Sequence, residues 1–472
     1  MGDIGDGDGT TGRAPDIGTG LGLGLGTGLG AELVAAVRAG DAEAVERLLD
    51  AGADPDTLAE DGLPVLCLAI DAYAEQVADA LMHAGADPDR VLPDGTTPLL
   101  RAIEGGSYGI YLGLLGKDPG LRLRGPAADR ALALARNRYE RCLVAPGERT
   151  RVQDGDWWGH LDELTLDGRT VRTGHGAILT DLEWTQRLLT PVEELADRAV
   201  AHPDPDHVDW GSALHVLTKR RSVRTWSAVA SLRHHPDPDR RRFAADVLRC
   251  LTLLEGEDTT PSFERETSEL LAAWAVEESD PRVLADVLSA WGTEHEHPDM
   301  VATGLRHADH PSPLVRAAVP DCLDASPLAP AARAALLTLA RDEDATVRRH
   351  ACAVLGRRHD GSPAVRACLV GLARDPDAEV RWCAAERLSE SDDHAPEIAD
   401  ALAGLLGEEK QLVRVIAAYG LMCRDDPRTA DGYARIGPPG PGLEHDHRWS
   451  RLWDRHRRRE QGYGNTSAAA EQ

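Results

Sequence analysis

The chain repeats itself with a period of 33 residues in two separate places. Gly-Ala-Asp-Pro-Asp begins at Gly52 and again, 33 residues later, at Gly85. Asp-Ala-x-Val-Arg begins at Asp344 and recurs at the same spacing at Asp377. A period of this size is typical of stacked helical units that bury their apolar faces against one another. Most residues in such a stack are needed for packing, so the pattern favours binding over catalysis.

Charge and cysteine usage narrow the class of protein. The 472 residues include 52 Lys and Arg against 79 Asp and Glu, a formal net charge of -27, which argues against general nucleic-acid binding. The eight cysteines form no C-x-x-C pair and are typical of small buried side chains in a reducing compartment. No signal peptide and no membrane-spanning run is expected. The sequence predicts a cytoplasmic protein, and its bias toward Ala, Arg, Gly and Asp suggests a GC-rich bacterial genome.

Residues 31–120 form the first array. Leucine recurs in register at 33-residue steps at Leu33, Leu66 and Leu99. Gly52 and Gly85 stand where the second helix of each unit would end, because glycine readily adopts the left-handed conformation that closes a helix. Asp-Gly pairs beginning at Asp61 and Asp94 predict an extended turn between units.

The first array resembles ankyrin repeats. Thr97-Pro98-Leu99-Leu100-Arg101-Ala102 corresponds to the family motif T-P-L-H-x-A, with Leu100 in place of the histidine. Gly-Ala-Asp stands where that family usually ends its second helix. The resemblance implies a helical solenoid that binds proteins, with the turn tips around Asp61 and Asp94 as candidate partner-binding residues.

The connector, residues 121–200, is less regular. Apolar positions from Ala131 to Cys142 follow a helical spacing, and this helix would cap the first array. Residues 163–172 predict a β-hairpin, because apolar residues alternate on both sides of Asp167-Gly168. His175 lies between two glycines in a predicted exposed loop. It is a candidate for binding or titration, the alternative being an ordinary turn residue.

Residues 201–430 form the second array. Val-Arg-x-x-Ala-x-x-x-Leu begins at Val347, Val380 and Val413. Looser copies extend back to His202, which gives about seven units in all. An aspartate three residues before the anchor position is predicted to cap the helix; these residues are Asp237, Asp280, Asp344 and Asp377.

The second array resembles HEAT repeats of the bacterial, phycobilisome-lyase-like kind, whose second helix carries the same Asp-x-x-Val-Arg pattern. The resemblance implies a ladder of Asp and Arg side chains along the stack, which would break where Lys410 replaces the aspartate. The expected members of the ladder are Asp344, Arg348, Asp377, Arg381 and Arg414. HEAT arrays serve many tasks, so a ligand-handling enzyme or chaperone of the bilin-lyase-like type stays open beside a binding protein.

Helix positions two and six residues past each anchor are predicted to face the groove of the second array. Trp, Tyr and Arg among them are the residue types that dominate interface energetics. The candidate partner-binding residues are Arg242, Asp246, Arg349, Trp382, Glu386 and Tyr419.

Two patterns suggest chemistry, but each has a simpler explanation. Gly105-x-Ser107-x-Gly109 matches the hydrolase nucleophile motif, yet it lies between two helices of an ankyrin unit with no strand before it. His295-Glu296-His297, near His307 and His310, is the densest group of imidazoles, in a predicted loop between HEAT units. One HEAT family, a di-iron hydroxylase, uses several His-Glu pairs, whereas here there is one. No catalytic residue, metal or cofactor is therefore predicted.

A basic segment closes the chain. Residues 448–459 hold six arginines with Trp449 and Trp453, which predicts a short basic amphipathic helix or a solvated extension. Its alternatives for docking are an acidic partner and the chain's own acidic arrays. Residues 227–430 carry 23 basic and 36 acidic side chains, a net charge of -13, which argues against a phosphate-binding groove like that of HEAT-like DNA glycosylases.

The sequence therefore predicts an all-α fold with two solenoids and one small β-hairpin. The predicted parts are a Gly-rich tail (1–30), ankyrin repeats (31–120), a helical connector (121–200), HEAT repeats (201–430) and a Pro/Gly- and Arg-rich tail (431–472). Solenoids present extended concave faces. We therefore expect a non-catalytic scaffold with protein partners, and neither nucleic-acid nor membrane binding.

Overall fold

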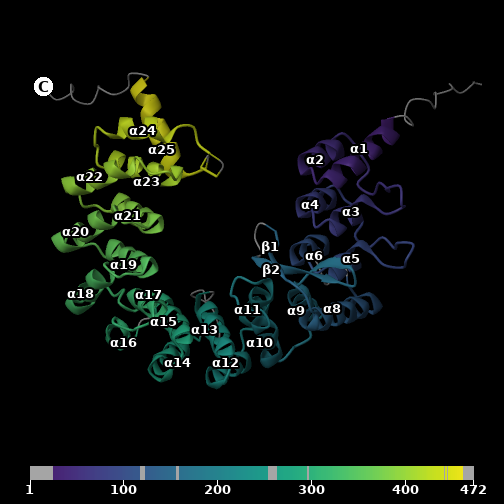
Figure 1. Ribbon diagram of the computed structural model, residues 1–472, viewed down its shortest axis with the longest axis horizontal. Helices are drawn as coiled ribbons and strands as arrows, with labels where there is room; N and C mark the ends of the chain where they lie inside the picture. The colour runs from purple at the N-terminus through teal and green to yellow at the C-terminus, as the bar shows by residue number, and fades with distance from the viewer. Residues whose placement is uncertain are drawn as a thin grey trace, which may run out of the picture. The chain divides into compact units, whose positions relative to one another are not determined.

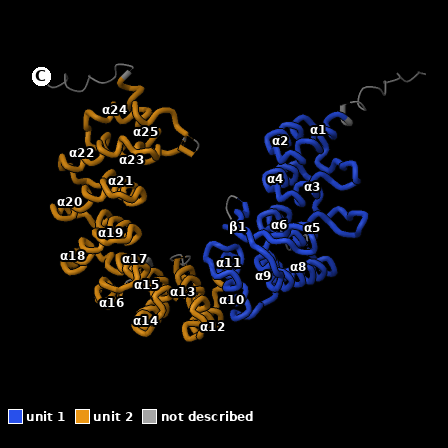
Figure 2. Tube along the Cα trace, viewed as in Figure 1, with its two compact units in different colours: residues 1–216 blue, residues 217–472 orange. Residues whose placement is uncertain are grey.

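The computed structural model describes residues 25–116, 123–155, 159–253, 263–294, 297–440, 442–443 and 445–460. The chain divides into two compact units, residues 1–216 and 217–472 (Figure 2). The described part is mainly helical with one small antiparallel sheet, which confirms the predicted fold class. None of the described helices combines the length and hydropathy needed to cross a bilayer. The predicted Gly-rich tail lies outside the described residues up to Gly24, and its last six residues belong to the first helix.

Three helix pairs begin unit 1 (Figure 1). They are α1 (Leu25–Ala39) with α2 (Ala42–Asp50), α3 (Val65–Asp71) with α4 (Glu75–His83), and α5 (Pro98–Gly105) with α6 (Tyr108–Leu115). First helices pack on first helices and second helices on second helices, and the in-register leucines predicted to form the core are buried. Gly52 and Gly85 follow the second helices with φ angles of 93° and 95°, the left-handed conformation expected there.

A sheet and four helices complete unit 1. They are α8 (Pro126–Val144), β1 (Thr150–Gln153), β2 (His160–Leu166), β3 (Arg169–Arg172), α9 (His175–Thr185), α10 (Val192–Val200) and α11 (Val208–Arg220), the last of which spans the boundary with unit 2. The predicted hairpin is confirmed, with Leu164 opposite Val171 and positive φ angles at Asp167 and Gly168. Strand β1 was not predicted; it pairs with β2 and gives the order β1-β2-β3.

Asp154 joins the sheet to the ankyrin array. It is fully buried and follows β1 directly. Its carboxylate accepts hydrogen bonds from the Ser107 hydroxyl at 2.7 Å and the Gly109 amide at 2.9 Å, both at the start of α6. On the sheet side, Arg172 of β3 donates to the same carboxylate at 3.2 Å. Asp154 thus connects the third ankyrin unit to both edge strands of the sheet, β1 and β3.

Unit 2 is a stack of helix pairs that begins after α11. Its elements are α12 (Val223–Ser231), the 3-10 helix η1 (Leu232–His234), α13 (Pro238–Leu253), α14 (Glu264–Glu277), α15 (Pro281–Glu294), α16 (Met300–His307), α17 (Pro313–Cys322), α18 (Pro330–Leu339), α19 (Ala345–Arg357), α20 (Pro363–Leu372), α21 (Ala378–Glu390), α22 (Pro396–Leu405), α23 (Gln411–Cys423), α24 (Thr429–Ile436) and α25 (His447–Glu460). Helices α13, α15, α17, α19, α21 and α23 pack in succession and form one row (Figure 1). Within unit 2 this row lies on the inner side of the curve (Figure 2).

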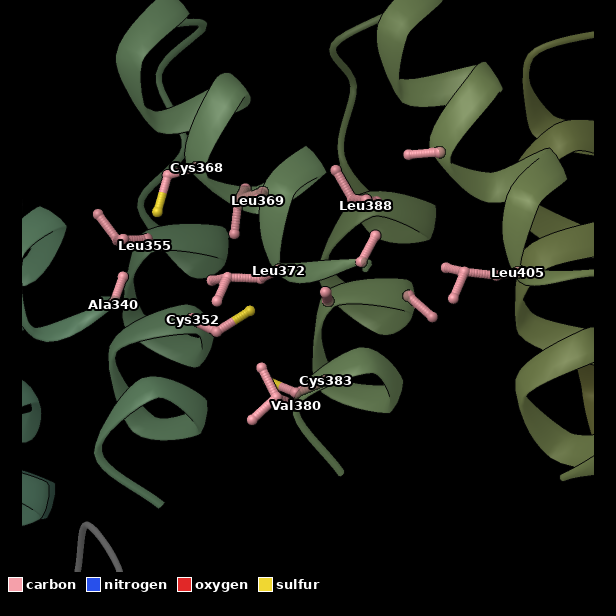
Figure 3. Packing of buried hydrophobic residues seen from close by; sticks show 14 of the residues in the cluster. Ala340, Cys352, Leu355, Cys368, Leu369, Leu372, Val380, Cys383, Leu388 and Leu405 are labelled. Atoms are coloured by element: carbon pink, nitrogen blue, oxygen red, sulfur yellow. The ribbon is translucent and has the colours of Figure 1, made fainter. Parts of the chain in front are cut away.

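The core of unit 2 is built from the repeated anchors. Val347, Val380 and Val413 are 0–2% exposed, and alanines four residues later let the helices approach closely. Cys352, Cys368 and Cys383 lie among the leucines of this core (Figure 3). Their thiols are free, which agrees with the prediction that cysteines act here as small apolar side chains.

The Asp-Arg ladder exists, but with other carboxylates than the resemblance implied. Asp344 and Asp377 cap their helices, each accepting two backbone N–H groups at 2.8–3.2 Å. Arg348 instead donates to both carboxylate oxygens of Asp375 at 2.8 and 2.7 Å. The predicted ladder partners were therefore wrong by two residues, because the carboxylate at the cap position already accepts the backbone N–H groups at the start of its helix.

The actual ladder is a set of two-pronged ion pairs between successive units. Each arginine also donates to two carbonyl oxygens of the loop before its own helix. The pairs are Arg241–Glu278, Arg316–Asp342, Arg348–Asp375 and Arg381–Glu408. The break predicted at Lys410 is wrong, because Glu408, two residues earlier, supplies the carboxylate for Arg381. In the described residues the ladder ends one position later, at Arg414, which reaches only the carbonyls of Glu408 and Glu409.

Candidate functional site

The candidate groove residues all lie on the inner row of unit 2. Arg349 is in α19, Trp382 and Glu386 in α21, and Tyr419 in α23, so these four come from successive helices of the row. Arg242 and Asp246 lie on α13, three helices earlier in the same row. Every one of the six is partly exposed, as side chains at the surface of a packed row must be.

Arg242 and Asp246 are already engaged within the array. Arg242 donates to Asp286 of α15 at 2.8 Å and lies 3.4 Å from Asp239. Asp246 accepts from Arg249, one turn along the same helix, at 2.5 Å. This end of the row therefore presents a pattern of paired charges.

Trp382, unlike the paired side chains of α13, has a polar group without a partner among the described residues. The side chain packs at the edge of the core and is partly exposed, yet its indole nitrogen is buried and has no hydrogen-bond partner among the described residues. Buried donors are normally satisfied, so this one calls for an acceptor. Arg349, on the preceding inner helix, has its guanidinium 2.9 Å from the His350 ring nitrogen and no carboxylate partner in the described residues. An aromatic ring and a cation without an acidic partner thus lie on adjacent helices.

Glu386 and Tyr419 are in contact with the C-terminal helix α25. Arg451 donates to the Tyr419 hydroxyl at 2.8 Å, and the His447 ring meets the Tyr419 ring edge-on at a centroid distance of 5.8 Å. Arg448 approaches Glu386 at 3.7 Å. The basic segment therefore forms the predicted amphipathic helix and docks on its own array.

His175 is not the exposed loop residue that was expected. It is the first residue of α9 and is fully buried, with Nε2 at 3.2 Å from the Glu104 carbonyl and Nδ1 at 3.6 Å from the Cys142 thiol. A Cβ at Gly106 would lie 2.4 Å from the imidazole, so a glycine is needed to admit the ring. The flanking glycines indicated flexibility, whereas glycine serves close packing here. His175 is a core residue.

The buried imidazole makes the stability of unit 1 sensitive to mild acid. Burial lowers the pKa of His175 to about 4, so the folded state stays neutral at pH values where the unfolded chain binds a proton. The contribution of His175 should be full above about pH 6.5 and fall as the pH approaches 4, by about 2 kcal/mol between pH 7 and pH 5. Burial also lowers the pKa of His207 to about 4, so the total loss in unit 1 should be larger. Urea titrations at the two pH values measure the loss. His175→Gln should make the dependence shallower; an unchanged slope would show that other groups cause it.

The ankyrin turn tips hold Asp61 and Asp94 as predicted. Each carboxylate accepts the backbone N–H two residues on, at 3.1 Å for Leu63 and 2.9 Å for Thr96, which closes the turn. The Thr96 hydroxyl also donates to Asp94, and these bonds hold the pKa of that carboxyl below its usual range. Both residues are exposed, so each has carboxylate surface left for a partner.

Ser107 has a structural role in agreement with the sequence argument. It is 1% exposed, accepts from the Ile110 amide as the N-cap of α6, and donates to Asp154. The first two residues of the His295 cluster lie outside the described residues. His297 and His310 each accept the backbone N–H two residues on, at 3.2 and 3.1 Å, which is the role of a turn residue.

His202, His207 and Asp209 form a cluster that sequence reasoning missed. Each offers one potential metal-ligating atom, all within 4.8 Å of one another. His207 Nδ1, however, accepts the Asp209 amide at 3.1 Å, which places the proton of the neutral ring on Nε2. Neither nitrogen of His207 then has a lone pair for a metal. Asp209 accepts the Ala177 amide at 2.6 Å, so the cluster joins the starts of α11 and α9.

A cavity of about 810 Å³ in unit 1 was also not predicted. It lies between α3, α5 and α8 and the β2–β3 hairpin, and its charged lining holds three carboxylates and three guanidinium groups: Asp71, Arg101, Glu104, Arg138, Asp167 and Arg169. Tyr73 lies at its edge, with its hydroxyl 2.8 Å from the Gly105 carbonyl and the Arg172 guanidinium 4.3 Å above its ring. No spacing in the sequence brings the hairpin onto the ankyrin helices, so nothing in the sequence pointed to this cavity.

Comparisons with known proteins agree with the repeat structure. The ankyrin repeat model (three copies) matches residues 33–122, and the HEAT repeat model matches residues 333–422. A search of curated proteins found no match.

Three solved structures are similar to the chain at low sequence identity. The X-ray structure of YIBA_ECOLI is 17% identical with a TM-score of 0.42, covering 56% of this chain and 92% of that one. An engineered protein is 14% identical with a TM-score of 0.34, covering 90% and 98%. The Pds5-Scc1 complex structure is 13% identical with a TM-score of 0.27, covering 91% and 62%. The matches to the family models show that the chain contains ankyrin repeats at residues 33–122 and HEAT repeats at residues 333–422.

Proposed function

We propose that the chain is a non-catalytic scaffold that holds protein partners on its ankyrin turn tips and on the inner row of unit 2. Ankyrin and HEAT repeats are typical protein-interaction modules. The observation that carries the proposal is Trp382, whose buried indole N–H has no acceptor in the described chain and whose neighbour Arg349 has no acidic partner there. A partner that packs on the exposed part of this ring and places an acidic group beside Arg349 would contact both side chains.

Trp382→Ala should weaken capture of the partner about 10- to 30-fold, because aromatic residues at the centre of an interface are its usual hot spots. The partner is captured from native cells with the full chain, identified by mass spectrometry, purified, and titrated against wild type and variant. Trp453→Ala is the matched control, since Trp453 is 42% exposed on the outer side of α25.

Equal affinity of wild type and Trp382→Ala for the purified partner would remove the groove from the proposal. Asp61→Ala and Asp94→Ala would then test the ankyrin turn tips in the same titration. A purified chain that carries a bound pigment would favour the ligand-handling enzyme instead.

A further inference from the structure

Helix α25 packs on unit 2 through one narrow face. Leu452 is the centre of this face and is 1% exposed. Trp449 and His456, one turn to either side, both stack on Tyr433 of α24, at centroid distances of 5.6 and 4.1 Å. Trp453, next to Leu452 in the sequence, and the last three arginines of the helix are exposed. The contact is thus a single leucine framed by stacked rings.

Arginines surround this apolar centre and meet acceptors on the array. Arg448 approaches Glu386, Arg451 binds the Tyr419 hydroxyl, and Arg455 binds Asp425 at 3.0 Å with the Met422 carbonyl at 3.4 Å. We call this surface the α25 dock; it consists of Glu386, Tyr419, Asp425, Tyr433 and the Met422 carbonyl. Its charge is complementary to the helix, since α25 has six arginines against two acidic residues.

The dock overlaps the candidate groove. Glu386 and Tyr419 were predicted from the repeat pattern to face a partner, and both touch α25. Glu386 lies one helical turn from Trp382 on α21, so a partner that follows the inner row past Trp382 meets α25 next. The chain therefore covers one end of its own groove.

We propose that the α25 dock is a binding site for an arginine-rich amphipathic helix of a partner protein, and that α25 occupies it as a built-in competitor. This rests on the proposed scaffold function and names the partner's chemistry: arginine, aromatic residue, leucine and arginine at the spacing R-W-x-x-L-x-x-R of residues 448–455. The contacts fit an occupant that can leave. Ion pairs with exposed partners such as Asp425, 84% exposed, hold weakly, and one leucine supplies the buried core.

The covalent linker favours α25 over a partner helix in the competition for the dock. Residues 437–446 tether α25 beside the dock, and a short tether gives an effective concentration on the order of millimolar. A partner helix in trans must overcome this local excess. If α25 occupies the dock nine-tenths of the time, the apparent affinity for the partner falls about tenfold.

The test uses the full chain and a fluorescent synthetic peptide of residues 447–460 as the probe. Leu452→Asp in the protein should release α25 and raise peptide affinity about tenfold over wild type, measured by anisotropy. Trp453→Asp is the matched control, an identical charge change on the exposed face, and should leave affinity unchanged. In the Leu452→Asp background, Glu386→Arg should abolish the gain. A peptide carrying Leu452→Asp should not bind.

A second release variant guards against misfolding. Trp449→Ala with His456→Ala removes both rings that stack on Tyr433 without placing a charge in the core, and should also raise peptide affinity. Circular dichroism and melting curves confirm that the array is intact. If both release variants are folded and bind the peptide no better than wild type, α25 is a permanent end cap and the proposal is wrong.

Two further outcomes are distinguishable. A wild-type dimer that the peptide dissociates, seen by light scattering, would overturn the proposal because the occupant would be a second copy of α25. The peptide assay does not use the native partner. If the peptide fails to bind while capture of the partner still depends on Trp382, only the α25 dock proposal is wrong. Peptide binding without Trp382-dependent capture would instead remove the groove assignment.

Discussion

Replacing Asp154 with alanine is expected to lower the free energy of unfolding of unit 1 by about 3–5 kcal/mol. The substitution leaves the Ser107 hydroxyl and the Gly109 amide without the carboxylate that accepts their hydrogen bonds. It also leaves Arg172 with only one of its two carboxylate partners, Glu163. All of these groups lie in the contact between the sheet and the third ankyrin unit. Chemical denaturation followed by circular dichroism measures the change.

A double-mutant cycle separates the buried charge from the lost bonds. In the Asp154→Ala background, Arg172→Met removes the guanidinium that has lost one of its carboxylate partners. The stability losses of the two single variants should therefore sum to more than the loss of the double variant. Asp206→Ala is the control, because Asp206 is exposed; it should change stability by less than about 0.5 kcal/mol. Strict additivity in the cycle would show that Asp154 and Arg172 do not act as a pair.

Replacing Arg348 with methionine is expected to cost about 3 kcal/mol, whereas Arg414→Met should cost about 1 kcal/mol. The two arginines occupy the same position in different units and both bind two carbonyl oxygens. Among the described residues, of these two arginines only Arg348 also binds a carboxylate, that of Asp375, and the side chains of this pair are 13% and 7% exposed. The difference between the two variants therefore isolates the ladder contact, and equal losses would contradict it.

Acid should weaken the same ladder. Hydrogen bonds from Arg316 hold the pKa of Asp342 below its usual range. Burial opposes ionisation of Asp375, but the bonds from Arg348 outweigh it and its pKa is lowered as well. A carboxyl with a lowered folded-state pKa stabilises above its unfolded value, near pH 4, and this contribution is lost as the pH falls further. The loss is thus expected at lower pH than the loss caused by His175 in unit 1.

The repeated positions of the fold were predictable because repetition itself reports packing. Leu33, Leu66 and Leu99 recur since each meets the same neighbour one unit on, and all three are buried. The capping role of Asp344 was also evident, since a carboxylate before a helix has one dominant local use. The ladder partner Asp375 was missed because the aspartate at each cap was given both roles.

Contacts between dissimilar parts were not predictable. His175 and Gly106 are 69 positions apart, and no pattern shows that the glycine admits the ring. The contact between Tyr419 and α25 likewise depends on a turn of the chain after Ile436 that no periodicity describes. The groove positions followed from helix geometry alone, but which of them the chain covers did not. Local rules thus predicted candidate positions, and the tertiary contacts show which of these positions the chain itself covers.

The Asp154 contact limits how the ankyrin array can change length. The Asp154 carboxylate accepts hydrogen bonds from two groups of the array, the Ser107 hydroxyl and the Gly109 amide, which both belong to the last ankyrin unit. The corresponding positions one period earlier are Ala74 and Gln76, and alanine has no hydroxyl to donate. A repeat inserted between the first and second units would leave the junction with the sheet intact. A copy of the second unit placed after the third would put alanine at the junction, so this array can gain units by duplication only upstream of its last one.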